Sequence, residues 1–452
     1  MRKFALFLFL ILSIIVFGVF RFGTPMLGII SGYSAKNMCS CVFIAGMEED
    51  NVIEEDLNFS FLSWSDIEID KANKSVKASV FGKGEKTAIY RDHIGCALVS
   101  SAGTKDIYRF KGEWPTQRFD SLVNWFDLRD TLQFLSRNTE QKVSSIVAGA
   151  FLEEEGRVKN TRAAVVIHKG KIIAEQYSEK IDKDTPLLGW SMTKSLTSTM
   201  FGQMQEEGML YLEEKVPVRA WQKDGRAEIR WKDLLQMSSG LKFAEVYSFV
   251  SDATLMLYDS DNMGAYAESL PATNQPGEKW YYSSGTSNII AYNLASSFPN
   301  LESYQLYLYN NFFYKIGAYS MVIETDASGY FVGSSYSWAT ARDWGRVGQV
   351  YVQNGNWDGE QVVPEEYIEF IRSPVAASDN SYGGHFWLNQ GGYLPDVPRD
   401  VYSLNGFQGQ RVFIVPSEDL VIVRLGLTYK RNDFDFNKWV SEIIKAVQED
   451  NQ

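Results

Sequence analysis

A serine and a lysine three residues apart are the strongest candidates for chemistry in the sequence. Ser191 and Lys194 open a stretch whose apolar residues recur with the spacing of one helix face, namely Met192, Leu196 and Met200. This spacing predicts a helix that buries that face and ends at Gly208. Both polar side chains would project from the same side of the helix near its N-terminus.

This arrangement suits acyl transfer. A serine at a helix N-terminus places its developing oxyanion near backbone N–H groups and the positive end of the helix dipole. A desolvated lysine beside it can lose its proton near neutral pH and act as the base that activates the hydroxyl. Ser191 is therefore a candidate nucleophile and Lys194 its candidate base.

The Ser-x-x-Lys spacing is weak evidence when it stands alone. About two matches are expected by chance in a chain of 452 residues, and the sequence contains two. The second match, Ser239–Lys242, has Gly240 inside it, so its two polar side chains need not share a helix face. We treat this second match as chance, and the rest of the sequence must distinguish the first.

Four sequence blocks in a fixed order supply that context. They are Ser191–Lys194 (SMTK), Leu234–Leu241 (LLQMSSGL), Pro276–Ser284 (PGEKWYYSS) and Gly406–Gln410 (GFQGQ). In order and spacing they resemble the serine β-lactamase-like hydrolases, the superfamily of class C β-lactamases and penicillin-binding proteins. The likeness is strongest to 6-aminohexanoate-dimer (nylon-oligomer) hydrolases and related esterases. It covers roughly residues 140 to 450 and leaves out the N-terminal third.

The resemblance implies a role for each matching residue. Ser191 would be the acylated nucleophile, Lys194 its general base, and Tyr282 the phenol that relays protons between lysine, serine and leaving group. The backbone N–H groups of Ser191 and Phe407 would form the oxyanion hole. Ser284, at a position where many members have Asn, would help to bind substrate. This mechanism needs no cofactor and no metal.

A departure from the family pattern bears on the substrate. Members that recognise penicillin place Lys or His just before the glycine of the last block to hold a carboxylate, but this chain has the uncharged Asn405 before Gly406. We therefore expect neutral short-chain esters or linear amides to be better substrates than penicillins. Arg411 is the rival anchor for an anion, and Tyr247 resembles a tyrosine that contacts the scissile amide in nylon-oligomer hydrolases.

Three other functions remain open from the sequence. Gly189–Thr193 is one residue short of the Gly-x-Ser-x-Gly turn of an α/β-hydrolase, which would need His385 as its base. The segment Tyr382–Trp387 around that histidine is predicted to be a strand or its edge. The domain could also be a non-hydrolytic penicillin-binding or sensor module, or an inactive scaffold. The intact serine, lysine and tyrosine argue against the last.

The N-terminus favours a membrane anchor. Arg2 and Lys3 precede an uninterrupted apolar run, Phe4–Phe20, with no small-residue cleavage site behind it. We expect a retained anchor rather than a cleaved signal, with the basic end in the cytoplasm and the catalytic domain periplasmic or extracellular. In an oxidising compartment Cys96 could pair with Cys39 or Cys41, although all three could equally be buried thiols.

Composition bounds the whole chain. The balance of 44 Lys+Arg against 56 Asp+Glu gives a net charge of −12, which argues against nucleic acid as a partner.

Hairpins are predicted at both ends of the catalytic region, from Ala163–His168 with Lys171–Gln176 and from Arg411–Val415 with Leu420–Arg424. Helices are expected over Ser144–Glu154 and about Asn437–Val447.

These elements predict an α+β (α/β sandwich) architecture. The resemblance implies the β-lactamase/transpeptidase-like fold, with a central antiparallel sheet flanked by helices. We divide the chain into a signal anchor (residues 1–25), a small N-terminal β-rich module (26–115) and a serine hydrolase domain (116–452). Strands of the module are expected at Ile67–Ile69, Ser75–Val80 and Ala88–Tyr90.

Overall fold

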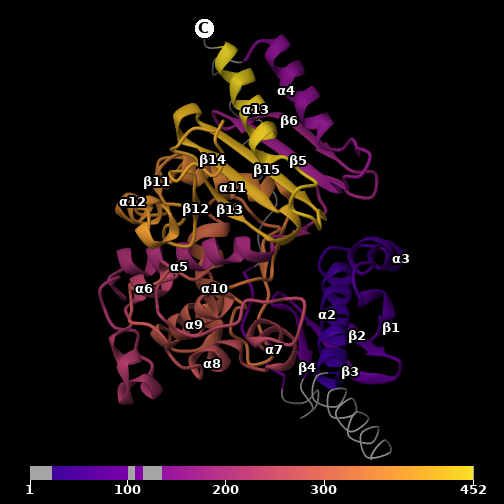
Figure 1. The fold of residues 1–452 in the computed structure, drawn as a ribbon, viewed down its shortest axis with the longest axis vertical. Coiled ribbons are helices and arrows are strands. Elements are labelled where there is room, and N and C mark those ends of the chain that lie inside the picture. Colours follow the sequence, from indigo (N-terminus) through magenta and orange to yellow (C-terminus); the bar gives the residue numbers. More distant parts are fainter. Residues whose placement is uncertain (1–22, 100–106, 116–134, 451–452) are drawn as a thin grey trace, which may run out of the picture.

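The computed structural model describes residues 23–99, 107–115 and 135–450. Figure 1 shows a sheet covered by helices in the upper half, a helical region below it, and an N-terminal module at the side of the helical region. The three parts meet around the N-terminal end of α5 (Thr193–Glu206), which carries the candidate site.

The central sheet is antiparallel, as predicted, and has six strands. Its spatial order is β12 (Trp387–Leu388), β13 (Tyr402–Asn405), β14 (Arg411–Val415), β15 (Leu420–Gly426), β5 (Thr161–His168) and β6 (Lys171–Tyr177). Both predicted hairpins are confirmed, and the pairing of β15 with β5 joins the two ends of the domain. The sheet therefore brings together strands from the two ends of the hydrolase domain, which are far apart in the sequence.

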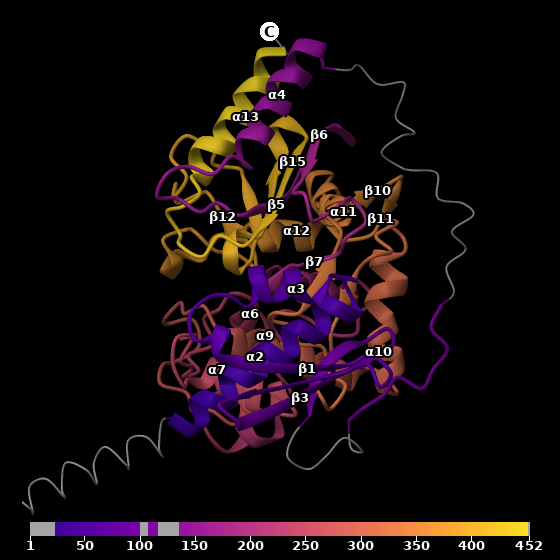
Figure 2. The same ribbon diagram turned by 90° about the vertical axis from the view of Figure 1, so that its right-hand side faces the viewer.

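Alternating residues of the central strands pack against helices on both faces. Ala164 and Val166 face α4 (Arg137–Gly149) and α13 (Phe436–Asp450), which lie side by side in Figures 1 and 2. Val165 and Ile167 face α11 (Ala341–Val352) on the opposite side. Because successive strand residues point to opposite faces, a continuous apolar strand such as β5 is buried on both.

The prediction of helix bounds before β5 was wrong. Helix α4 begins after Ser136, whose hydroxyl oxygen accepts a hydrogen bond from the N–H of Thr139, and it ends at Gly149 rather than Glu154. Glu153 instead accepts hydrogen bonds from the backbone N–H groups of Lys159 and Asn160. Its carboxylate stabilises the turn that leads into β5, so residues 150–154 do not continue the helix.

Short elements fill the space below the sheet and beside it. The helices are α5, α6 (Trp231–Leu235), α7 (Asp252–Asp259), α8 (Met263–Glu268), α9 (Ser284–Leu294), α10 (Leu301–Leu308) and α12 (Glu365–Arg372). The small strands are β7 (Leu187–Leu188), β8 (Val322–Ile323) and β9 (Ser337–Ala339), with a separate pair β10 (Asn356–Trp357) and β11 (Glu360–Gln361). Helix α5 buries its predicted face, Met192, Leu196 and Met200, in the core that these elements share.

The N-terminal module combines one long helix with a four-stranded antiparallel sheet. Helix α2 (Thr24–Phe43) packs on the sheet β1 (Ser65–Asp70), β2 (Ser75–Val80), β3 (Lys83–Arg91) and β4 (Gly95–Val99). A short helix, α3 (Glu49–Asn51), follows α2. Of the two pairings that the sequence left open, a disulfide joins Cys39 to Cys96, while Cys41 is a buried free thiol.

Buried polar contacts attach this module to the hydrolase domain. Lys36 Nζ of α2 lies 2.6 Å from a carboxylate oxygen of Glu324, and both side chains are almost fully buried. Glu324 also accepts hydrogen bonds from the Cys96 backbone N–H and the Trp338 indole. The proposed domain division stays a prediction, since the segment 116–134 lies outside the described residues.

The predicted anchor, Phe4–Phe20, also lies outside the described residues. Within the described ranges, no helix combines the length and the apolar character needed to cross a bilayer.

Candidate active site

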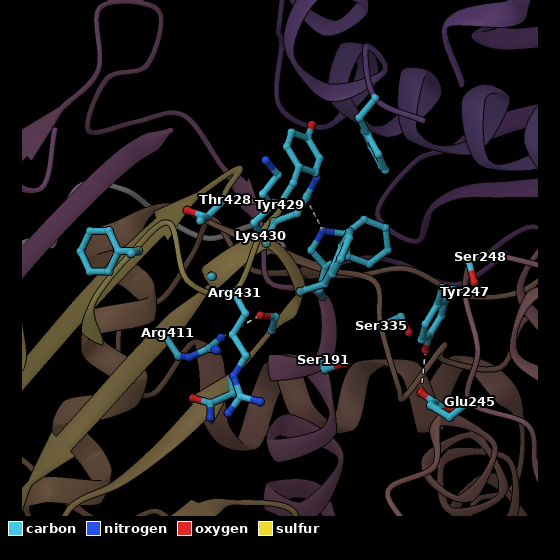
Figure 3. Close-up of a pocket in the computed structure, with 18 of the residues that line it drawn as sticks. Ser191, Glu245, Tyr247, Ser248, Ser335, Arg411, Thr428, Tyr429, Lys430 and Arg431 are labelled. Atoms are coloured by element: carbon cyan, nitrogen blue, oxygen red, sulfur yellow. Dashed lines mark hydrogen bonds between the residues drawn. The ribbon is translucent and has the colours of Figure 1, made fainter. Parts of the chain in front are cut away.

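Ser191 occupies a tight turn that leads directly into α5. The turn Trp190–Met192 is a single 3-10 turn, and Trp190 has a left-handed backbone with φ of 48°. The Trp190 carbonyl accepts a hydrogen bond from the Thr193 hydroxyl, and its indole N–H donates to Gln408. These contacts hold a conformation that non-glycine residues rarely adopt, and they leave Ser191 half-buried at a cavity wall (Figure 3).

Lys194 lies directly behind the serine. Its Nζ is 3.1 Å from Ser191 Oγ, 3.1 Å from Ser284 Oγ and 2.9 Å from the Ser334 carbonyl oxygen. Only 1% of Lys194 is exposed. Burial lowers its pKa to about 8, although the charge of Glu245 opposes this shift. A useful fraction of the amine is therefore neutral near pH 7 and can accept a proton.

Tyr282 completes the group of three that the sequence predicted. Its ring centre lies 4.8 Å from Lys194 Nζ, and its phenol forms a hydrogen bond with the Ser191 side chain. Burial raises the pKa of this phenol above its usual range, so the hydroxyl stays protonated. The residue precedes α9, whose first turn is capped by the Ser283 side chain. Three side chains from two helix starts thus meet at one point.

A glutamate that the sequence analysis did not select connects these residues. Ser284 donates a 2.6 Å hydrogen bond to Glu245 Oε1, and the Tyr247 hydroxyl donates to the same oxygen at 2.6 Å. The Tyr247 hydroxyl is also 3.0 Å from Ser284 Oγ. Glu245 lies two residues before Tyr247 in a loop without regular secondary structure, so its closeness to the selected Tyr247 was the signal that could have identified the carboxylate.

Ser284, a predicted substrate contact, lies outside the cavity lining. The residue is fully buried and its hydroxyl is used by Lys194 and Glu245. It is positioned to hold the lysine, because it lies behind Lys194 rather than in the cavity wall.

The strand edge that follows β13 approaches the serine turn closely. A Cβ atom on Gly406 would lie only 2.1 Å from the Gly189 carbonyl oxygen, so only glycine permits this approach. The next residue, Phe407, lines the cavity, and its ring lies 5.7 Å from that of Trp190. The backbone segments that carry Ser191 and Phe407 are therefore brought to the same end of the cavity.

Asn405 and Arg411 face each other across the edge of the sheet. They are register partners on β13 and β14, and both line the cavity. The Asn405 side-chain oxygen is buried without a hydrogen-bond partner among the described residues. Arg411 donates to the carbonyls of Gly406 and Gln410, and burial lowers its pKa to about 10, which leaves it charged at neutral pH. Arg411 therefore supplies a positive charge beside the uncharged Asn405.

His385 does not take part in the site. It is 2% exposed, its Nε2 lies 2.8 Å from Ser287 Oγ, and its Nδ1 lies 2.7 Å from the Leu235 carbonyl oxygen. Burial lowers its pKa to about 3. The predicted strand around it is also mostly wrong, because His385 has a φ of 65° and β12 begins only at Trp387. The histidine is a packed core residue, which removes the base that the α/β-hydrolase alternative requires.

The candidate site opens into a cavity of about 1170 Å³. Figure 3 shows Arg411 and Arg431 on one side of Ser191, with Glu245 and Tyr247 on the other. The cavity is thus cationic at one end and carries a carboxylate at the other. Across the described part of the chain, no three His, Cys, Asp or Glu side chains gather as metal ligands would.

The second Ser-x-x-Lys match forms no comparable site. Gly240 has a φ of 74°, and a Cβ there would meet the Asn274 carbonyl oxygen at 2.2 Å. Ser239 is buried while Lys242 is exposed.

Solved structures share the fold at low sequence identity. A Bacillus anthracis protein named provisionally as a 6-aminohexanoate-dimer hydrolase is 21% identical, with a TM-score of 0.56 over 64% of this chain and 79% of its own. A family VIII carboxylesterase is 15% identical, with a TM-score of 0.53 over 70% and 99% of the two chains. A class C β-lactamase mutant is 12% identical, with a TM-score of 0.52 over 68% of this chain and 97% of its own. No curated relative matches at a significant level.

The sequence model of the β-lactamase family matches residues 153–441, which is more than half of the chain. The match contains Ser191, Lys194, Tyr282 and the strand edge at Gly406, and it begins after the N-terminal module. The chain therefore belongs to the β-lactamase family of serine hydrolases.

Proposed function

We propose that the protein hydrolyses an ester or amide bond of a small substrate through a covalent acyl-enzyme on Ser191. The observation that carries this proposal is the contact of Ser191 Oγ with Lys194 Nζ at 3.1 Å, combined with a lysine pKa of about 8. An amine that is partly neutral at pH 7 and touches the hydroxyl is placed to be its general base.

The reaction would proceed in two balanced stages. In the first, Ser191 Oγ bonds to the substrate carbonyl carbon while neutral Lys194 accepts the hydroxyl proton. The backbone N–H groups of Ser191 and Phe407 stabilise the oxyanion. The C–O or C–N bond then breaks, and the proton passes through the Tyr282 hydroxyl to the leaving group. In the second stage water attacks the ester, releases the acid and returns a proton to Ser191.

The uncharged Asn405 still favours neutral esters or linear amides over penicillins. Its unpartnered side-chain oxygen could accept a hydrogen bond from a substrate N–H. Arg411 supports the opposite preference, because it brings a charged guanidinium to the same cavity. Comparing a neutral and an anionic ester of equal size decides between them. Faster turnover of the neutral ester supports the role of Asn405. A strong preference for the anion would indicate that Arg411 binds the substrate instead.

Hydrolysis must be distinguished from covalent binding without turnover, the function of a penicillin sensor. Mixing the enzyme with a short p-nitrophenyl ester separates the two, since a hydrolase gives a burst followed by steady release. Release that stops after one equivalent, with Ser191 still acylated by mass spectrometry, would assign the protein as a sensor. Labelling of Ser191 by a fluorophosphonate probe tests the nucleophile in either case.

We further propose that the chain is membrane-anchored, with the catalytic domain outside the cytoplasm. The support is the apolar run Phe4–Phe20 behind Arg2 and Lys3, together with the disulfide Cys39–Cys96, a bond typical of oxidising compartments. Cell fractionation should find the uncleaved protein in the membrane pellet. Recovery of uncleaved protein wholly in the cytoplasmic fraction would end this proposal.

A further inference from the structure

The cavity at Ser191 is built by two parts of the chain. Helix α2 contributes Ile29 and Ile30 to its wall, and the following segment contributes Phe59 and Phe61. All four residues precede residue 153, where the family match begins. The N-terminal module is therefore one wall of the substrate cavity rather than a separate attachment.

Aromatic contacts connect this wall to the turn that carries the nucleophile. The ring of Tyr33 on α2 is stacked on Trp190, the residue before Ser191, with their centres 6.0 Å apart. Tyr33 also contacts Phe59, which in turn lies 4.4 Å from Tyr429. The apolar wall thus begins beside the serine and is continuous with the site.

The chemistry of this wall differs from that of the rest of the cavity. The cavity residues on α2, and those on the neighbouring α7, are uncharged and mostly apolar. The charged residues of the lining come from other segments and are Arg157, Glu245, Arg411, Lys430, Arg431 and Asp435. A polar substrate group placed against the apolar side would lose its water without gaining partners. An apolar chain would gain free energy there in proportion to its buried area.

The size of the cavity leaves room for such a chain. Its volume of about 1170 Å³ exceeds the roughly 300–1,000 Å³ typical of small-molecule sites. A short ester that reaches Ser191 would leave most of the α2 side empty.

We infer that the α2 side of the cavity binds an apolar chain of the substrate, so that the preferred substrates are medium-chain or long-chain esters or amides. This inference rests on the proposed reaction at Ser191 and specifies its substrate class. The carbonyl group lies at the serine, the chain extends along α2 and Phe61, and the polar remainder lies toward the charged end.

A chain-length series tests the inference directly. The full-length protein is assayed with p-nitrophenyl acetate, butyrate, hexanoate and octanoate, each below its micelle-forming concentration. Each methylene group of the acyl chain that is completely buried can raise kcat/KM by up to about fourfold. We expect kcat/KM to increase by at least about tenfold from acetate to octanoate.

Two aromatic residues of the same module give a matched pair of variants. Phe61 lines the cavity and is 46% exposed, whereas Phe81 is 71% exposed and contacts Trp64 outside the cavity. Phe61→Ser should reduce the octanoate-to-acetate ratio of kcat/KM by about fivefold, since the octanoyl chain loses the part of the phenyl ring against which it would be buried. Phe81→Ser should leave the ratio unchanged. Both positions are exposed, so neither change should prevent folding.

The outcomes separate this inference from the proposed reaction. If no ester is hydrolysed and a short fluorophosphonate does not label Ser191, the proposed reaction fails. If acetate is hydrolysed but kcat/KM stays flat or falls with chain length, the reaction stands and the inference is overturned. An equal loss of the ratio in Phe61→Ser and Phe81→Ser also overturns it. A second variant, Met26→Glu, places a charge in the α2 wall and should reduce the ratio further.

Discussion

Lys194 reaches its working pKa through a balance of two effects. Burial disfavours the ammonium form, while the Glu245 carboxylate, linked to the lysine through the Ser284 hydroxyl, favours it. The balance places the pKa at about 8 rather than lower. If the neutral amine is the base, as proposed, kcat/KM should rise with pH through about 8 and then level.

Removing the carboxylate should shift this profile. In Glu245→Gln the charge that raises the lysine pKa is lost, so the midpoint of the pH–kcat/KM profile should move below that of the wild type. The measurement is kcat/KM for a neutral ester between pH 6 and about 9. Glu179→Gln, an exposed position, is the control and should leave the midpoint in place. An unchanged midpoint in Glu245→Gln would exclude the carboxylate as a tuning group.

The sequence was enough to select the three candidate catalytic side chains, but not the residues that hold them. Ser191, Lys194 and Tyr282 stand in local blocks, so spacing and resemblance were enough to select them. Glu245 belongs to no such block, and its importance depends on a fold that brings it to Ser284. The burial of Ser284 was not predicted for the same reason, because the burial of a side chain is set by tertiary packing.

Among the secondary-structure elements, the edge after β13 is the one whose tight packing bears on the site. Gly406→Ala should force apart the Phe407 segment and the serine turn, since its Cβ would lie 2.1 Å from the Gly189 carbonyl oxygen. Loss of one oxyanion donor lowers kcat by about 10²–10³-fold. We expect a kcat decrease of this order with the thermal stability monitored in parallel. Gly149→Ala, where an added Cβ meets nothing within 4 Å, should leave kcat unchanged.

Strands were predicted better than the segments between them. The hairpins β5–β6 and β14–β15 agree with their predicted ranges within one or two residues, because continuous apolar runs bounded by turn residues define them. The start of α4 was missed because it depends on a cap at Ser136, eight residues before the predicted helix. The strand expected around His385 was reduced to two residues by a left-handed turn.

We expect the stability of the whole molecule to depend on the buried contacts between the N-terminal module and the hydrolase domain. Glu324→Gln should leave the buried Lys36 without its ionic partner, which typically costs about 3–5 kcal/mol. Urea unfolding should detect this loss in the free energy of unfolding. In the exposed pair Lys77–Glu85, Lys77→Ala should change that free energy by less than about 1 kcal/mol. Similar effects of the two variants would mean that the buried pair does not secure the interface.

The central claim is that Lys194, and not a histidine, activates Ser191. The most direct test compares kcat/KM of Lys194→Ala and His385→Gln with that of the wild type on a short neutral ester, after circular dichroism has shown that each variant is folded. Lys194 touches the serine hydroxyl, whereas His385 is held by Ser287 and the Leu235 carbonyl. The expected result is a loss of at least about 100-fold in Lys194→Ala and near-native turnover in His385→Gln. Near-native turnover in Lys194→Ala, with activity abolished in folded His385→Gln, would contradict the claim.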